Sequence, residues 1–152
     1  MRFMAIVKAS KDSEAGVMPP REVFEAMGKF NEEMAKAGVL LAAEGLHPSS
    51  RGARVGFSGK KVTVTDGPFT ETKELIAGFW LLQVKSKEEA IEWIKRSPFQ
   101  DFSDSGDTKA GPEIEIRQVF EAADFSSDVF PPEQAAREEA LRVELQKKAA
   151  KK

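Results

Sequence analysis

The stretch that decides the fold reads GFWLLQV, at residues 78–84, and it is the most strongly apolar run of the chain. Polar residues end this run from Lys85 onward, and a short apolar run that stops in this way is typical of a strand buried in a sheet. We therefore expect a buried strand here. Phe79 and Trp80 are expected to pack in the core or an interface, and one of them to line a pocket.

A helix is predicted directly after this strand. Ser86 is a good N-cap and Glu89 follows it at the spacing of a capping box. The helix should end near Arg96, because Pro98 disfavours helical geometry in the residue before it. Its apolar face consists of Ala90, Ile91, Trp93 and Ile94. The alternating pattern of residues 113–120 then predicts a final, half-exposed strand.

Two short strands are predicted before the central run, at residues 53–57 and 61–65. The Ser58-Gly59-Lys60 segment separates them, and a short connection that contains glycine is typical of a β-hairpin. Val62 and Val64 should lie on one side of this hairpin.

The N-terminal part predicts a strand, a helix and a strand. Residues 2–9 favour a central strand that stops at a polar turn, residues 10–13. A helix follows Pro19-Pro20 and stops at Gly38, and residues 39–46 can pair as a short strand. The apolar face of the helix has three- and four-residue spacings and consists of Val23, Phe24, Met27, Phe30, Met34 and Ala37.

The predicted order of elements is strand, helix, strand, hairpin, strand, helix, strand. This order indicates an α+β fold, a ferredoxin-like plait with an inserted β-hairpin. Two helices cover one face of such a sheet, and a second copy of the chain is the simplest cover for the other face. We therefore expect a homodimer that pairs through the sheet face.

Length and composition limit the possible classes of protein. The 152 residues and 41% hydrophobic content suit one domain, predicted at residues 1–121, with a charged, partly helical C-terminal extension at residues 122–152. The 23 Lys and Arg balance 25 Asp and Glu, so no basic surface predicts nucleic-acid binding. No cysteine is present, which favours the reducing cytoplasm, and Lys8 interrupts the first apolar run too early for a membrane segment.

Residues 66–69, which read DGPF, are a strong turn signal. Glycine accepts positive φ and proline fixes φ, so a tight turn is expected. Ionisable side chains are dense around the turn: Asp66 within it, and Glu71, Lys73 and Glu74 after it. Carboxylates held beside apolar walls such as Phe69 can have raised pKa values and act as acid or base.

The string DGPFTETKE at residues 66–74 resembles the DGPF signature of the YCII-related family. The flanking strings GVL and EGL before it, within residues 38–46, and GFWLL after it, at residues 78–82, agree with that family. The resemblance covers roughly residues 1–120. It implies a dimeric α/β barrel of ferredoxin-like protomers, with a pocket in each protomer near the signature turn.

The resemblance also implies two kinds of activity. Some YCII-related proteins use a His-Asp pair for elimination chemistry on small molecules, and the DGPF branch is often linked with sigma-factor regulation. Asp66 matches the signature aspartate. His47, the only histidine, lies in the EGLxP segment, where the branch does not generally demand histidine.

Each candidate residue also has a structural interpretation. Asp66 can simply accept backbone N–H groups within its own turn, and Glu71 can form a surface ion pair with Lys73. His47 can be a solvated loop side chain, and Glu44 can make a structural hydrogen bond. The spacing of the acidic residues and His47 matches no known metal-ligand pattern, so no metal is predicted.

Two functions remain open on the sequence. The first is a small enzyme that needs no cofactor, in which Asp66, with His47 or Glu71, transfers a proton on a small organic acid, quinone or similar ring. The second is a non-catalytic module that holds a ligand, or a protein partner such as a transcriptional regulator. The predicted ligand-binding residues are Glu44, Phe69, Lys73, Glu74 and Trp80.

Overall fold

The computed structural model describes residues 1–102 and 111–149. The chain forms two compact units, Met1–Val119 and Phe120–Lys152, which are described separately. Within the described residues, no helix is long and apolar enough to cross a membrane.

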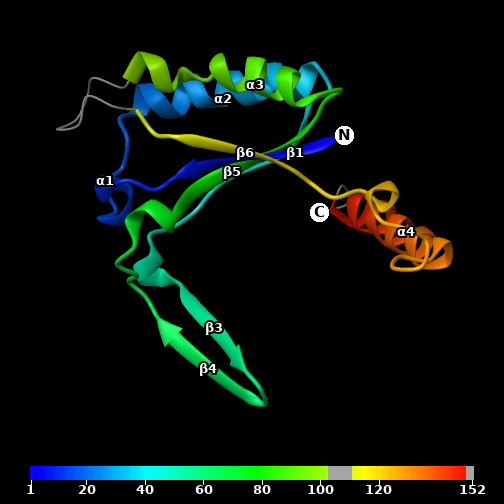
Figure 1. The fold of residues 1–152 in the computed structure, drawn as a ribbon. Coiled ribbons are helices and arrows are strands. Elements are labelled where there is room, and N and C mark those ends of the chain that lie inside the picture. The colour runs from blue at the N-terminus through cyan, green and yellow to red at the C-terminus, as the bar shows by residue number, and fades with distance from the viewer. Residues whose placement is uncertain (103–110, 150–152) are drawn as a thin grey trace. The chain divides into compact units, whose positions relative to one another are not determined.

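The first unit is built on a four-stranded antiparallel sheet (Figure 1). Its strands, in sheet order, are β2 (Leu40–Gly45), β5 (Ile76–Gln83), β1 (Arg2–Lys8) and β6 (Ile114–Gln118). The predicted central position of the first strand is confirmed, because β1 pairs with both β5 and β6. The fold is α+β, and its strand order is compatible with a ferredoxin-like plait.

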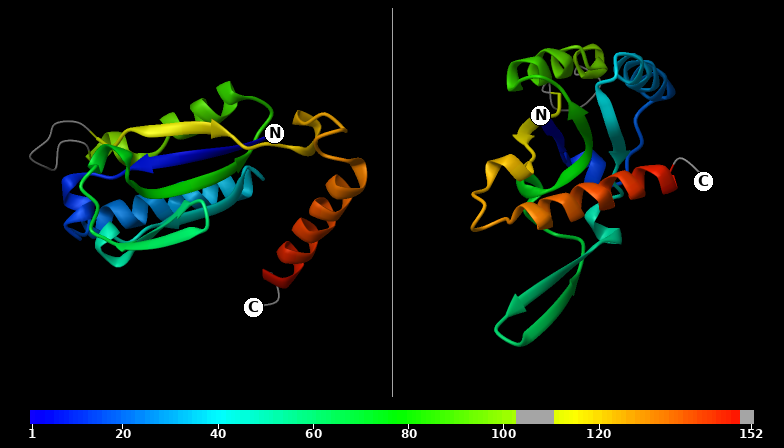
Figure 2. Two further views of the ribbon diagram at one scale, coloured as in Figure 1. Left: turned by 60° about the horizontal axis from the view of Figure 1, so that its bottom comes forward. Right: turned by 90° about the vertical axis from the view of Figure 1, so that its right-hand side faces the viewer.

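Two helices, α2 (Arg21–Lys36) and α3 (Lys87–Lys95), lie on the same face of this sheet (Figure 2). The predicted ends of both helices are confirmed. Gly38 follows α2 with φ of +71°, a conformation that glycine adopts without a steric penalty. The Ser86 hydroxyl accepts the Glu89 N–H at 3.1 Å and so caps α3.

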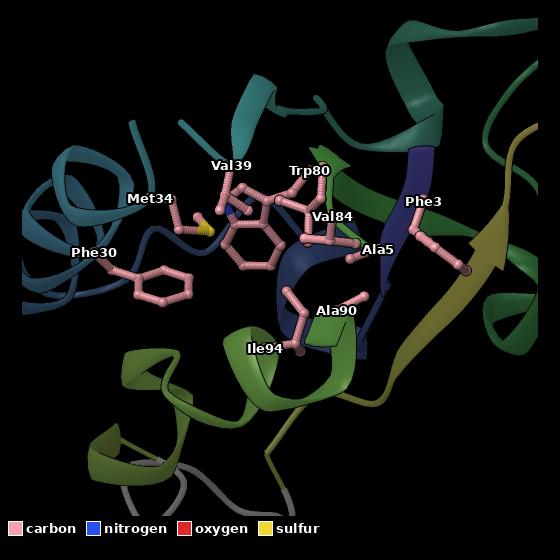
Figure 3. Close-up of a cluster of buried hydrophobic side chains, with 10 residues drawn as sticks. Phe3, Ala5, Phe30, Met34, Val39, Trp80, Val84, Ala90 and Ile94 are labelled. Atoms are coloured by element: carbon pink, nitrogen blue, oxygen red, sulfur yellow. The ribbon is translucent and has the colours of Figure 1, made fainter. Parts of the chain in front are cut away.

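The core lies between these helices and the sheet (Figure 3). The Trp80 ring meets Phe30 of α2 edge-to-face, with 5.9 Å between ring centroids. Its indole N–H donates to the Asn31 amide oxygen at 2.8 Å, so the polar atom of this buried ring is satisfied. The buried core residues are Phe3, Ala5, Phe30, Met34, Val39, Trp80, Leu82, Val84, Ala90 and Ile94.

The opposite face of the sheet, which we call the open face, also carries apolar side chains. Met4 is paired with Leu81, and Ile6 with Phe79, and all four are partly exposed. They alternate along β1 and β5 with the core residues Phe3, Ala5, Trp80 and Leu82. Both described helices of this unit that pack on the sheet, α2 and α3, lie on the other face (Figure 1).

A separate two-stranded hairpin lies between β2 and β5 in the chain. Its strands are β3 (Ala53–Ser58) and β4 (Lys61–Asp66), and every residue of both is exposed. Ser58 pairs with Lys61, so the connection is the two residues Gly59 and Lys60 rather than the expected three. The hairpin extends away from the side of the sheet that carries the helices (Figures 1 and 2).

Short helical turns connect these elements. The polar segment at residues 10–13 was expected to be a turn, but it begins a short helix, α1 (Lys11–Glu14). Ser10 and Ser13 form a reciprocal capping box, which supplies partners for the free N–H groups of the first turn. The 3₁₀ turns of this unit are η1 (Ser49–Arg51), η2 (Thr72–Glu74) and η3 (Pro98–Phe102).

The second unit consists of η4 (Ala122–Asp124) and a long helix, α4 (Pro132–Ala149). Neighbouring aromatic rings lie tilted against one another before the helix, with 5.1 Å between the centroids of Phe120 and Phe125 and 5.6 Å between those of Phe125 and Phe130. Leu141 and Leu145 of α4 are half exposed.

Candidate functional site

The signature turn is joined to the loop that follows β2. The Gly67 N–H donates to the Gly52 carbonyl at 2.9 Å, and the Phe69 N–H donates to the Ser49 hydroxyl at 3.0 Å. A Cβ atom on Gly67 would lie 1.7 Å from the Ser49 carbonyl oxygen. Only glycine therefore allows the two backbones to approach so closely.

Ser49 is held in turn by Glu14, the last residue of α1. The Ser49 hydroxyl donates to the Glu14 carboxylate at 2.5 Å, and the Ser49 N–H lies 3.2 Å from both carboxylate oxygens. We call Glu14, Ser49 and the Phe69 N–H the latch. Hydrogen bonds to an ionised group are the strong ones, so the latch fixes the turn relative to α1 and η1.

Sequence reasoning missed the latch. Neither Ser49 nor Glu14 was singled out in the sequence. The two residues lie 35 positions apart, and no local pattern indicates which carboxylate a loop hydroxyl will meet.

Arg54 of β3 joins the aromatic and acidic side chains that follow the turn. Its guanidinium carbon lies 3.9 Å from the centroid of the Phe69 ring, and its Nη1 atom lies 3.6 Å from Glu71 Oε2. The expected ion pair between Glu71 and Lys73 is wrong, because the cation beside Glu71 is Arg54. Arg54 was also missed, since it lies on the hairpin and reaches Glu71 only through tertiary structure.

The expected raised carboxyl pKa is wrong for Glu71. Hydrogen bonds from its own backbone N–H and from the Thr70 side chain, together with the charge of Arg54, hold the pKa of the Glu71 carboxyl below its usual value. Desolvation opposes these effects but does not outweigh them, and Glu71 is exposed. Its carboxylate is therefore suited to remain ionised and to attract a cation or a hydrogen-bond donor, not to donate a proton near neutral pH.

Asp66 is the last residue of β4, where it pairs with Ala53. Its carboxylate is exposed, and across residues 1–102 and 111–149 it has no hydrogen bond or ion pair. The structural interpretation, in which Asp66 accepts N–H groups of its own turn, is therefore wrong for this conformation. The turn is held instead by Gly67 and Phe69, which leaves the Asp66 carboxylate available.

The other predicted residues near the turn are exposed and spread over several elements. His47 precedes η1, and its ring nitrogens lie 3.2 and 3.3 Å from Arg51 Nη1. Glu44 lies on β2, opposite Phe79. Lys73 and Glu74 lie in η2, and in the described part of the chain Lys73 pairs with neither Glu71 nor Glu74.

Trp80 does not lie with these residues. It was predicted to bind ligand, but its ring is 4% exposed and packs in the core, as Figure 3 shows. Its neighbours are Phe30 of α2 and Phe99 of η3. The alternation of β5 explains the difference, because Phe79 and Leu81 face the open side of the sheet while Trp80 faces the helices.

Two depressions of the described surface lie on α3, beside Trp93, and on α4, beside Val143. Neither depression is lined by a predicted site residue. Among the described residues, no three His, Asp or Glu side chains are grouped closely enough to hold a metal ion.

The YCII-related domain family matches residues 1–103. The chain belongs to this family. A relative of this chain is an uncharacterised protein of Rhizobium meliloti (strain 1021), which is 28% identical over 118 residues, or 78% of this chain and 86% of the relative.

A solved structure similar to this YCII-related chain is 5-chloro-2-hydroxyhydroquinone dehydrochlorinase from Burkholderia phenoliruptrix AC1100, in complex with 2,5-dihydroxybenzoquinone. The two chains are 13% identical with a TM-score of 0.43, and the match covers 83% of this chain and 100% of the dehydrochlorinase.

Proposed function

We propose that the signature turn is a cofactor-independent site at which Asp66 accepts or donates a proton on a small organic molecule. The observation that carries this proposal is the state of the Asp66 carboxylate. It is exposed and without a partner among the described residues, whereas the carboxylates of Glu14 and Glu71 are engaged. An available carboxylate on a fixed turn is free to approach a bound ligand, as a general acid or base must.

The neighbouring side chains have distinct roles in this proposal. The latch holds the backbone of residues 67–69, and Phe69 offers a flat apolar surface to a ring. Arg54 supplies positive charge beside that ring, which favours an organic acid or a phenolate. Glu71 acts as an ionised ligand-binding group, and His47 is a second proton carrier if the ligand reaches η1.

Ligand binding by the intact protein tests this site. A screen of small organic acids, phenols and quinones should find compounds that shift the amide resonances of residues 66–71 in a saturable way. Asp66→Asn should abolish turnover of such a compound, while the dispersed NMR spectrum of the variant shows that it is still folded. Glu32→Gln, an exposed change in α2, is the matched control and should keep turnover. Equal turnover in both variants would reject Asp66 as the proton carrier.

The homodimer is part of the same proposal. Met4, Ile6, Phe79 and Leu81 make an apolar open face that α2 and α3 do not cover. Covering this face with part of a second copy would exclude water from it, in an assembly of the dimeric α/β-barrel kind. Light scattering that shows a monomer at micromolar concentration would contradict the homodimer.

The second candidate function is a non-catalytic interaction module, with a transcriptional regulator as the kind of partner. The exposed apolar side chains of the hairpin favour it, because large exposed apolar patches mark protein interaction sites. The two candidates differ in the effect of Asp66→Asn. It should leave partner binding unchanged if the chain acts only through the hairpin.

A further inference from the structure

The hairpin has one apolar face, which we call the hairpin face. Val55 pairs with Val64, and Phe57 pairs with Val62, and residues paired in this way lie on the same side of a sheet. The exposed fractions are 53% for Val55, 78% for Phe57, 58% for Val62 and 68% for Val64. The other side carries Arg54, Thr63 and other polar residues.

The hairpin face needs a cover. An isolated two-stranded hairpin is marginally stable in water, and packing of a hydrophobic face normally supports it. Here β3 and β4 pair only with each other, and every residue of both strands is exposed. Four large apolar side chains gathered on one such face therefore indicate a surface that becomes buried in an assembly.

The same unit also lacks a cover on its open face. Met4, Ile6, Phe79 and Leu81 form two paired rows across β1 and β5. The hairpin of the same chain extends away from the sheet and does not pack on these strands (Figure 1). Each copy therefore carries two apolar β surfaces. The hairpin face projects from the chain, and the open face can receive the hairpin face of another copy.

We propose that two copies exchange hairpins, with the hairpin face of each packed against the open face of the other. This arrangement rests on the proposed homodimer and specifies how its interface is built. Two sheets pack face to face through alternating apolar side chains, which both surfaces provide. Because each copy gives one hairpin and receives one, a two-fold axis closes the assembly without leaving a surface free to form fibres.

The exchange has a consequence for the signature turn. Asp66 ends β4 and Arg54 lies at the start of β3, so both belong to the base of the exchanged arm. In the pair, the base of each arm lies beside the second copy. The second copy then supplies a wall for the Asp66 site, which a single chain leaves open.

Cross-linking tests the exchange directly, because the natural chain contains no cysteine. One population carries Phe57→Cys and a long affinity tag, and a second carries Ile6→Cys without the tag. The two populations are mixed to exchange subunits and treated with a short bis-maleimide. The adduct of one tagged and one untagged chain should form in several-fold higher yield than when Thr63→Cys replaces Phe57→Cys. Thr63 lies on the polar side of the same hairpin and is the matched control.

Different failures identify different errors. A dimer by light scattering without the mixed adduct would overturn the exchange and leave the homodimer intact. A dominant adduct between two Phe57→Cys chains would mean that hairpins pair with each other. In a double variant that carries both Phe57→Cys and Ile6→Cys, a cross-link within one chain would mean that the hairpin folds back on its own sheet. A monomeric natural chain would overturn both the exchange and the homodimer.

A charge substitution gives a second measurement. Phe57→Lys should raise the dimer dissociation constant by about thirtyfold or more, the effect expected for an aromatic residue at the centre of an interface. Thr63→Lys adds the same charge to the polar side and should leave the constant nearly unchanged. Equal effects of the two variants would reject the hairpin face as the contact surface.

Discussion

Strand β5 and the β3–β4 hairpin are neighbours in the chain and share a composition rich in apolar β-formers, but their environments differ completely. In β5 the exposed fraction is 4% for Trp80 and 0% for Leu82, whereas on the hairpin it is 78% for Phe57. β5 lies between β1 and β2 with helices above it, whereas among the described residues β3 and β4 pair only with each other. Composition therefore indicates strand formation, while topology decides which strands a single chain can bury.

The largest expected effect comes from truncating one aromatic residue in each region. Trp80→Ala should lower the free energy of unfolding by about 3–5 kcal/mol, because it leaves a cavity and removes the donor to Asn31. Phe57→Ala should change it by less than about 0.5 kcal/mol in the monomer, since the ring is exposed. Urea unfolding at several protein concentrations measures both.

The concentration series sharpens this comparison. A cost of Phe57→Ala that grows with protein concentration would mean that assembly buries the hairpin face. A large cost in the dilute monomer would mean that the hairpin is already covered by its own chain, which would contradict the difference between the two regions.

A smaller effect is expected from adding one methyl group at the signature turn. Gly67→Ala should destabilise the protein by about 1–3 kcal/mol or more, because the new Cβ would collide with the Ser49 carbonyl. Gly28→Ala in α2 is the control: no atom lies within 4 Å of its Cβ position, so it should stabilise by up to about 1 kcal/mol. Thermal unfolding of both variants should show changes of opposite sign.

The smallest effect concerns Glu71, at the base of the hairpin. Its lowered carboxyl pKa means that its contribution to stability is present above the ordinary glutamate value of about 4.3 and is lost as the pH falls through the folded-state value. Carbon-detected NMR titration should place its midpoint below the ordinary glutamate value. Arg54→Gln should move the midpoint of Glu71 upward. An unchanged midpoint would show that Arg54 does not contribute.

Most elements of the first unit were predictable because their signals are local. The Ser86 cap, the Gly38 stop and the alternation of Ile114 and Ile116 each act within one or two turns or along one strand. The start of α1 was missed, since the Ser10 and Ser13 side chains that favour turns also cap helices.

The candidate site was predictable only in part. The turn at Asp66-Gly67-Pro68-Phe69 was evident, because glycine and proline restrict the backbone wherever they occur. The partners of that turn were not, because Glu14, Ser49 and Arg54 come from three other segments. Trp80 was assigned to the ligand site because its strand is apolar on both faces, and the sequence does not state which face the helices cover.

The sequence by itself determined the strands, the two helices and the tight turn, since backbone preferences and apolar periodicity act over a few residues. Only the tertiary structure decided that Glu71 meets Arg54, that the latch satisfies the turn and leaves Asp66 available, and that the hairpin face stays exposed. Hydrogen bonds and ion pairs act over a few ångströms in space, and the chain brings distant residues within that range only when the sheet is assembled.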